Sequence, residues 1–234
     1  RVWRIALEEA KGRAFVIAGT GTNVTESSIA LTRRAAAVGV DGCMLSAPYY
    51  NKPTQGGLLA HFRAVADAVD IPLVIYNVPG RTAVNILPAT VAELAAHPRI
   101  TAIKEASGSL DQVTEILARC EITLLSGDDS LTLPMLAVGA KGVVSVAGHL
   151  VGNEMRRMLE TFESGRVAEA AEIHRRVFPL IQALFRESNP GPVKAALALL
   201  GLIQEELRLP LVPAGEGTRD LLAREMAALG LLAR

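Results

Sequence analysis

Between residues 15 and 146 the chain repeats one pattern six times: a short apolar run followed by a stretch with helical spacing. The runs are continuously apolar and do not alternate with polar residues, as is typical of strands that are buried on both faces of a sheet. Strands that alternate with helices form a parallel sheet covered by helices, so the pattern predicts the α/β class. The predicted strands are residues 15–19, 40–48, 72–79, 100–104, 122–126 and 142–146.

Helical spacing without further strands takes over after Gly148. We therefore predict two domains: residues 1–165 hold the sheet and its helices, and residues 166–234 form a C-terminal helical domain. Glycine and proline clusters separate the later helices, as expected of helix breaks. The predicted helices are residues 27–38, 58–69, 88–96, 110–118, 131–138, 154–162, 166–186, 193–204 and 218–232.

The number of strands leaves two architectures open. A closed (β/α)8 barrel takes about 250 residues and eight strands, whereas only six units precede residue 165. The sheet is then either an open, doubly wound one or a (β/α)8 TIM barrel whose first two strands are missing from this chain. Helical spacing already runs through Val2, Ile5 and Ala6, which favours the second architecture and makes residues 1–165 the third to eighth βα units.

The balance of charge argues against a polyanionic partner. Lysine plus arginine and aspartate plus glutamate each number 24, and aromatic residues make up only 4% of the chain. Such a chain has no net field to attract nucleic acid or an anionic membrane, and few rings for stacking on bases. No uncharged stretch approaches the roughly 20 residues that cross a bilayer. We expect neither nucleic acid nor a membrane as a partner.

Cysteine, histidine and glycine spacing predicts no metal or organic cofactor. Cys43 and Cys120 form no C-x-x-C pair, and the four histidines are scattered, so no zinc site and a reducing, cytoplasmic compartment are expected. Gly19 and Gly21 lack the third glycine of a dinucleotide-binding fingerprint.

Lys104 ends the fourth predicted strand and precedes a Ser/Gly turn, so its amine is expected at the lip of a buried strand. A lysine amine titrates near about 10.4 and becomes a useful nucleophile only when desolvation or a cationic neighbour lowers its pKa. A strand buried on both faces supplies that desolvation. The alternative is a lysine that reaches solvent at a strand end.

Other polar side chains also follow the predicted strands at their C-terminal ends, which is the catalytic face of a parallel barrel. These residues are Thr20, Asn23, Tyr49, Tyr50, Tyr76, Asn77, Arg81, Ser126, Asp128, Asp129 and Ser145.

Two of these side chains suit catalysis beside Lys104. Tyr76 leaves a buried strand, and its hydroxyl is suited to pass protons to a group attached to Lys104; a core tyrosine bonded to a carbonyl is the alternative. Arg81 lies in a predicted loop, where a guanidinium suits a carboxylate; a solvated loop charge is the alternative. For Asp128 and Asp129, capping of the following helix is favoured over a pair of catalytic acids.

Seven segments together resemble one family, the class I, pyruvate-dependent aldolases and lyases, and within it the dihydrodipicolinate synthase branch. They occur in the family's order and span most of the chain. The segments are VIAGTGTN (16–23), APYYNKP (47–53), YNVPGRT (76–82), IKEASG (103–108), LLSGDD (124–129), GVVSV (142–146) and NPGPVK (189–194).

The resemblance implies a catalytic group. Lys104 is similar to the lysine that forms a Schiff base with pyruvate, and Tyr76 to the general acid and base of the proton relay. Tyr50 resembles the relay tyrosine that a neighbouring subunit contributes across a tight dimer, which implies a homotetramer built as a dimer of dimers. The family's Thr-Thr-Gly-Glu loop, which supplies a relay threonine, has no counterpart in this sequence.

The resemblance also implies substrates. Arg81 resembles the residue that binds the carboxylate of L-aspartate 4-semialdehyde, and Gly127 and Val144 match positions that line the pyruvate pocket. The implied function is a lyase that condenses pyruvate with L-aspartate 4-semialdehyde to 4-hydroxy-tetrahydrodipicolinate, in lysine and diaminopimelate biosynthesis, without a cofactor. Two alternatives stay open: a related aldolase of the 2-keto-3-deoxygluconate or N-acetylneuraminate type, and a catalytically silent truncated homologue.

Overall fold

The structure is a computed structural model that describes residues 1–232. It contains one six-stranded sheet in which neighbouring strands are parallel and follow one another in chain order. The prediction of an α/β fold with six parallel strands is therefore confirmed. The strands are β1 (Ile17–Gly19), β2 (Gly42–Ser46), β3 (Leu73–Asn77), β4 (Ile100–Glu105), β5 (Thr123–Ser126) and β6 (Gly142–Val143).

The chain divides into two compact units. The sheet unit comprises residues Arg1–Gly127 and Ala137–Val143, and the helical unit comprises Asp128–Leu136 and the chain from Val144 onward. Each unit is described by itself below.

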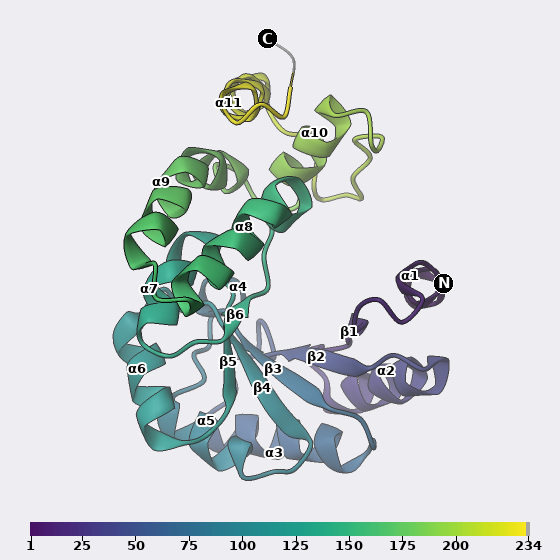
Figure 1. Cartoon of the computed structure of the whole chain (residues 1–234). Coiled ribbons are helices and arrows are strands. Elements are labelled where there is room, and N and C mark those ends of the chain that lie inside the picture. The colour runs from purple at the N-terminus through teal and green to yellow at the C-terminus, as the bar shows by residue number, and fades with distance from the viewer. Residues whose placement is uncertain (233–234) are drawn as a thin grey trace. The chain divides into compact units, whose positions relative to one another are not determined.

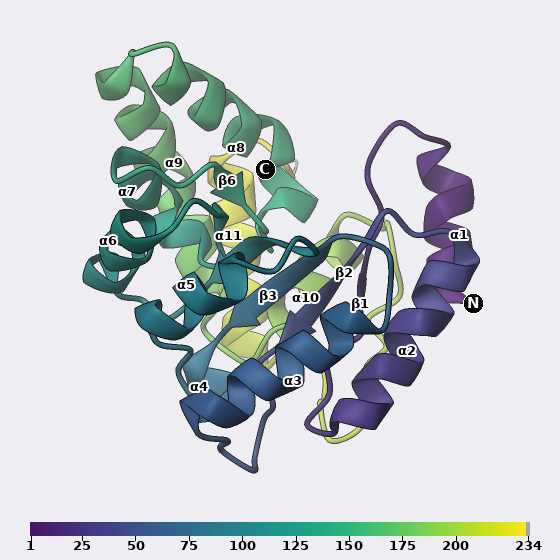
Figure 2. The same ribbon diagram turned by 90° about the horizontal axis from the view of Figure 1, so that it is seen from below.

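In the sheet unit, helices cover one face of the curled sheet (Figures 1 and 2). The helices of this unit are α1 (Val2–Ala10), α2 (Thr25–Val38), α3 (Gln55–Asp67), α4 (Pro79–Thr82), α5 (Pro88–Ala95) and α6 (Leu110–Arg119). Neighbouring helices pack side by side in the order α1, α2, α3, α5 and α6. The largest fully buried side chains of this unit come from the strands, from three of these helices and from the segment before α5: Leu45, Leu58, Phe62, Leu73, Ile75, Ile86, Leu94, Ile103, Ile116 and Leu124. The main core of the unit is thus the layer between the sheet and its helices.

Local sequence signals set where several of these helices begin and end. The Thr54 hydroxyl accepts a hydrogen bond from Gly57 N at 3.2 Å and begins α3, and the Ser109 hydroxyl accepts one from Gln112 N at 3.1 Å and begins α6. Gly39 ends α2 with φ of 93°, a left-handed conformation that glycine adopts without strain. These caps fix connections at both ends of the strands: Gly39 precedes β2, and Thr54 and Ser109 follow β2 and β4.

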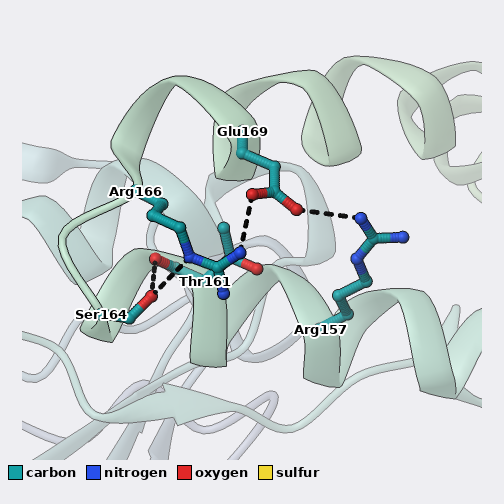
Figure 3. Close-up of polar contacts among 5 residues, drawn as sticks. All are labelled: Arg157, Thr161, Ser164, Arg166 and Glu169. Atoms are coloured by element: carbon teal, nitrogen blue, oxygen red, sulfur yellow. Dashed lines mark hydrogen bonds and ion pairs between the residues drawn. The ribbon is translucent and has the colours of Figure 1, made fainter.

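The helical unit is held by packing between α8 (Gly148–Glu163) and α9 (Val167–Leu184), with η1 (Asp129–Leu131), α7 (Thr132–Ala137), α10 (Gly191–Leu199) and α11 (Glu216–Ala228) completing it. Figure 3 shows Glu169 of α9 between two arginines: Arg157 donates to its carboxylate at 2.9 Å and Arg166 at 2.8 Å. The hydrogen bond from Arg157 and the charges of both arginines hold the pKa of Glu169 below its usual value. These two ion pairs therefore join α8 to the start of α9 as long as the Glu169 carboxylate is ionised.

Asp129 is not the helix cap that was expected of one of the two aspartates. Its Oδ2 accepts hydrogen bonds from the backbone of Val146 and Ala147, both at 3.0 Å, and Ser145 donates to its Oδ1. Asp129 is 1% exposed. Asp129 joins η1 to the segment before α8, 17 residues later at Val146. Helical spacing alone does not reveal this contact.

Several predicted elements differ from the structure in their bounds; α8, for example, begins at Gly148 and not at residue 154. The strand predicted to reach residue 146 ends at Val143, because the Val146 N–H bonds to Asp129 and not to a neighbouring strand. The helix predicted over 193–204 begins at Gly191 and ends at Leu199, with Pro192 in its first turn, where a proline needs no hydrogen-bond partner. The predicted loop around Arg81 contains the one-turn helix α4.

Candidate active site

Lys104 and Tyr76 lie side by side at the C-terminal ends of two neighbouring strands. They are register partners in the parallel pairing of β3 and β4. The Lys104 Nζ lies 4.1 Å from the centroid of the Tyr76 ring, within the range of a cation–π contact. Both side chains are half-buried. The structure thus brings together the amine and the phenol that the sequence analysis put forward as a pair.

Gly127 fits closely against the stem of Lys104. It directly follows β5, and its N–H donates to the carbonyl of Glu105 at 2.7 Å. A Cβ at this position would lie 2.7 Å from Ala106 Cβ and 3.0 Å from Lys104 Cε, distances that real Cβ atoms do not adopt or reach only with strain. Any residue with a Cβ at position 127 would force the Lys104 side chain or its neighbours to move.

Gly21 explains why a glycine-rich loop follows β1. A Cβ on Gly21 would collide with the backbone of Leu45 and Ser46 on β2. The loop therefore uses glycine to pass close to the neighbouring strand, and this packing accounts for the residue without a bound nucleotide.

Tyr50 and Arg81 lie on the segments that follow β2 and β3. Tyr50 is 87% exposed and adopts φ of 75°, an uncommon conformation for a residue with a side chain. Arg81 is exposed in the last turn of α4. Val144 directly follows β6 and is half-buried. The roles expected of these three residues stay predictions.

A buried polar cluster on the other side of the β3–β4 pair was missed by the sequence analysis. Glu105 is 1% exposed and Asn77 is fully buried, and the two are register partners. The Asn77 Nδ2 donates to both oxygens of the Glu105 carboxylate, at 3.2 and 3.0 Å. The available signal was a pair of polar residues, each at the end of an otherwise apolar strand and each next to a candidate catalytic residue.

The two cysteines are poor candidates for a nucleophile. Burial raises the pKa of the Cys43 thiol, against a smaller opposing effect of a hydrogen bond with Thr20, and burial also raises the pKa of Cys120. A thiolate is the reactive form, so a raised pKa disfavours attack at neutral pH.

Across residues 1–232, no cluster of three histidine, cysteine, aspartate or glutamate side chains is placed to hold a metal ion. Over the same residues, no helix is both long and apolar enough to cross a bilayer.

Chemically, a lysine amine beside a phenol can form an imine with a ketone and move the protons that the reaction requires. The strand ends supply the geometry: β3 and β4 hold the two groups in register, and Gly127 fixes the stem of the lysine.

Comparison with known proteins shows the family of the chain. The model of the dihydrodipicolinate synthetase family matches residues 1–229. The chain is 51% identical over 234 residues to the 4-hydroxy-tetrahydrodipicolinate synthase of Pelobacter propionicus, covering 99% of this chain and 81% of that protein. It is 54% identical over 223 residues to the enzyme of the same name from Desulforudis audaxviator, covering 94% and 76% of the two chains.

Solved structures of the same family superpose on the chain. The dihydrodipicolinate synthase of Thermotoga maritima matches with a TM-score of 0.97 and 41% identity, covering 99% of this chain and 79% of that one. A structure described as the first monomeric dihydrodipicolinate synthase variant matches with the same TM-score and identity, over 99% and 79% of the two chains. The chain belongs to the dihydrodipicolinate synthetase family.

Proposed function

We propose that this protein is a lyase that condenses pyruvate with L-aspartate 4-semialdehyde to give 4-hydroxy-tetrahydrodipicolinate, on the route to diaminopimelate and lysine. The observation that carries the proposal is the Lys104 amine 4.1 Å from the Tyr76 ring centroid at adjacent strand ends, in a chain of this family. The reaction itself is inferred from the name of the relatives, 4-hydroxy-tetrahydrodipicolinate synthase.

The first half of the proposed reaction makes a nucleophile from pyruvate. The neutral Lys104 amine attacks the ketone carbon, and the carbinolamine loses water to leave an iminium ion. The Tyr76 hydroxyl gives and takes the protons of these steps. The positive nitrogen then draws electrons from the neighbouring methyl group, which loses a proton and becomes an enamine carbon.

The second half forms the carbon–carbon bond and frees the enzyme. The enamine carbon attacks the aldehyde carbon of L-aspartate 4-semialdehyde, and the aldehyde oxygen takes a proton and becomes the hydroxyl group. The amine of the bound product then attacks the imine carbon, closes the ring and displaces Lys104. One water is released in total, and no electrons are gained or lost, so the chain's own side chains suffice.

Binding of the two acids is proposed for Arg81, Gly127 and Val144. Arg81 would pair its guanidinium with the carboxylate of the semialdehyde, as its exposed place at the end of α4 allows. Gly127 and Val144 would line the space that pyruvate fills. The contact of Gly127 with the lysine stem supports its part of this assignment.

The architecture and assembly are proposed on the same basis. The sequential order of six parallel strands supports a (β/α)8 barrel, of which this chain holds the third to eighth units in residues 1–165, with a helical domain in residues 166–234. We propose a cytoplasmic homotetramer in which Tyr50 reaches the site of a neighbouring subunit. Its exposure and uncommon backbone conformation support a role outside its own subunit.

Reductive trapping tests the proposed chemistry. Incubation with pyruvate and borohydride is expected to leave a stable adduct on Lys104, found by peptide mass spectrometry. Lys104→Arg removes the nucleophile, so the adduct should vanish and the condensation rate should fall by about a thousandfold or more.

Lys141→Arg is the matched control, because Lys141 is an exposed lysine of the same unit. This variant should trap pyruvate as the unmodified chain does. An adduct on another lysine, or none, would contradict the proposal. Faster turnover of 2-keto-3-deoxygluconate than of the semialdehyde would move the chain to the related aldolase reaction.

A further inference from the structure

We propose that Glu105 is a positioning residue: its buried carboxylate, held by amide donors on the helix side of the sheet, fixes the end of β4 and so the place of the Lys104 amine. This inference rests on the proposed function, because it concerns the same lysine. It adds to that function a group that never touches the substrate.

Glu105 and Lys104 point to opposite faces of the sheet, because successive side chains of a strand alternate. Ile75 and Ile103 are register partners in the core and fully buried, and Asn77 and Glu105 are the next pair on that same face. Lys104 lies on the other face with Tyr76. Glu105 and Lys104 are therefore neighbours in the strand, but the carboxylate and the amine lie on opposite faces of the sheet.

Three neutral amide groups hold the carboxylate. Asn77 Nδ2 donates to both oxygens, the backbone N–H of Ser107 donates to Oε1 at 2.7 Å, and Gln112 Nε2 donates to Oε2 at 3.2 Å. The donors come from β3, from the turn after β4 and from α6. Glu105 thus links its strand to three neighbouring pieces of the chain.

The network continues through a second pair of amides. Asn85 and Gln112 bond to each other reciprocally, at 2.7 and 3.1 Å, and Asn77 Nδ2 donates to Asn85 Oδ1 at 2.7 Å. A carboxylate accepts hydrogen bonds and does not donate them, whereas an amide does both and can turn over. The Ile86 N–H also donates to Asn77 Oδ1 at 3.0 Å, so Glu105 and this N–H together set the direction of the hydrogen bonds in the network.

The main chain of Glu105 carries this order to the lysine. Its carbonyl accepts from Gly127 N, and Gly127 packs against the Lys104 stem. When the side chain loses its partners, the strand end gains freedom and the amine moves with it. A displacement of about 1 Å at a reacting group is enough to cost on the order of a hundredfold in rate.

Glu105→Gln is the first test. It keeps the shape but places an amide N–H₂ against the donors of Asn77 and Gln112. We expect the rate of borohydride-trappable imine formation at saturating pyruvate to fall at least tenfold, with kcat falling in parallel and KM for the semialdehyde changing less than threefold. Imine formation at the unmodified rate would overturn the proposal.

Asn77→Asp in the Glu105→Gln background is the rescue test. The pair then has its donor and acceptor exchanged, and half-turns of the Asn85 and Gln112 amides restore the hydrogen bonds between positions 77 and 85, 85 and 112, and 105 and 112. Two weaker bonds are lost, from position 77 to Oε1 and from Gln112 Nε2 to the Ile86 carbonyl, so the rescue is expected to be partial. We expect the double variant to form the imine at least threefold faster than Glu105→Gln, although Asn77→Asp alone slows it by setting two carboxylates together. A double variant no faster than the slower single variant would contradict the network.

A stability control separates positioning from general loosening. Thr90 is 3% exposed and donates to Gln55 Oε1 at 2.6 Å in the same unit. Thr90→Val should lower the melting temperature while imine formation stays unchanged; a matching loss of rate would show that any destabilisation slows the lysine and would overturn the inference.

Gln112→Met serves if Glu105→Gln fails to fold. It removes one donor to the carboxylate and should slow imine formation at least threefold, so an unmodified rate in this variant also refutes the inference. Absence of any adduct in the unmodified chain would instead count against the proposed function.

Discussion

Gly127 has no room for a side chain beside Lys104. In Gly127→Ala the new methyl group would press on Lys104 Cε and Ala106 Cβ. Overpacking of this kind costs about 1–3 kcal/mol in the free energy of unfolding, and here it would also move the nucleophile. We expect lower stability in chemical denaturation and at least tenfold slower reductive trapping.

Gly152→Ala is the matched control at this scale. Gly152 follows the kink at Val151 in α8, and no atom outside its own helix backbone and chain neighbours comes within 4 Å of a Cβ built there. Alanine is therefore expected to be tolerated at this position without loss of stability. Equal destabilisation by the two variants would mean that the contact with the lysine stem has no special cost.

Between elements, His61 joins α3 to α2. It is 5% exposed, its Nδ1 lies 3.0 Å from the Thr25 hydroxyl, and burial lowers its pKa below the usual 6.5. The unfolded chain binds a proton at higher pH than the folded chain does. Stability is therefore full above pH 6.5 and falls as the pH drops below that value. The slope has a limit of about 1.4 kcal/mol per pH unit for one proton.

His61→Asn should remove this part of the pH dependence, as measured by urea unfolding between pH 5 and pH 7. His174 provides the companion variant, because burial and the charge of Arg175 also lower its pKa. His174→Asn should remove a separate share of the slope. A His61→Asn variant with the slope of the unmodified chain would show that this imidazole titrates alike in both states.

At the scale of the whole molecule, the proposed sharing of Tyr50 between subunits can be tested by mixing. Lys104→Ala and Tyr50→Phe subunits are each expected to be nearly inactive alone. If Tyr50 serves its neighbour, random pairing makes about half of the dimers mixed, each with one intact site, so about a quarter of the normal rate returns. Light scattering checks that mixed oligomers form.

If mixed oligomers recover no activity, Tyr50 acts at the site of its own subunit. The outcome matters for the whole assembly, since one solved relative is described as a monomeric variant.

Much of the architecture is visible in the sequence because it rests on local patterns. Continuous apolar runs predict buried parallel strands, and helical spacing predicts the helices between them. Lys104 and Tyr76 could be named as a pair because parallel strands bring their C-terminal ends to one edge. The confirmed parts of the prediction are thus those carried by local patterns or by the general rule that the C-terminal ends of parallel strands meet.

The parts that were wrong or missed depend on distant partners. The strand before α8 ends early because Asp129, 17 residues away, takes the Val146 N–H. The Glu105 carboxylate is bound by the amides of Asn77 and Gln112, which come from two different elements. A pattern of residue types does not reveal such pairings, because many polar residues are compatible with each position until the register is known.

By itself, the sequence determined the class of fold and the number of parallel strands, and it named the lysine and tyrosine that the structure brings together, because hydrophobic periodicity and a distinctive set of motifs are local properties. Only the tertiary structure decided which atoms meet: the amine over the Tyr76 ring, the glycine against the lysine stem and the amide network around Glu105. These contacts follow from strand register and from packing across the sheet, which are set by the whole unit at once.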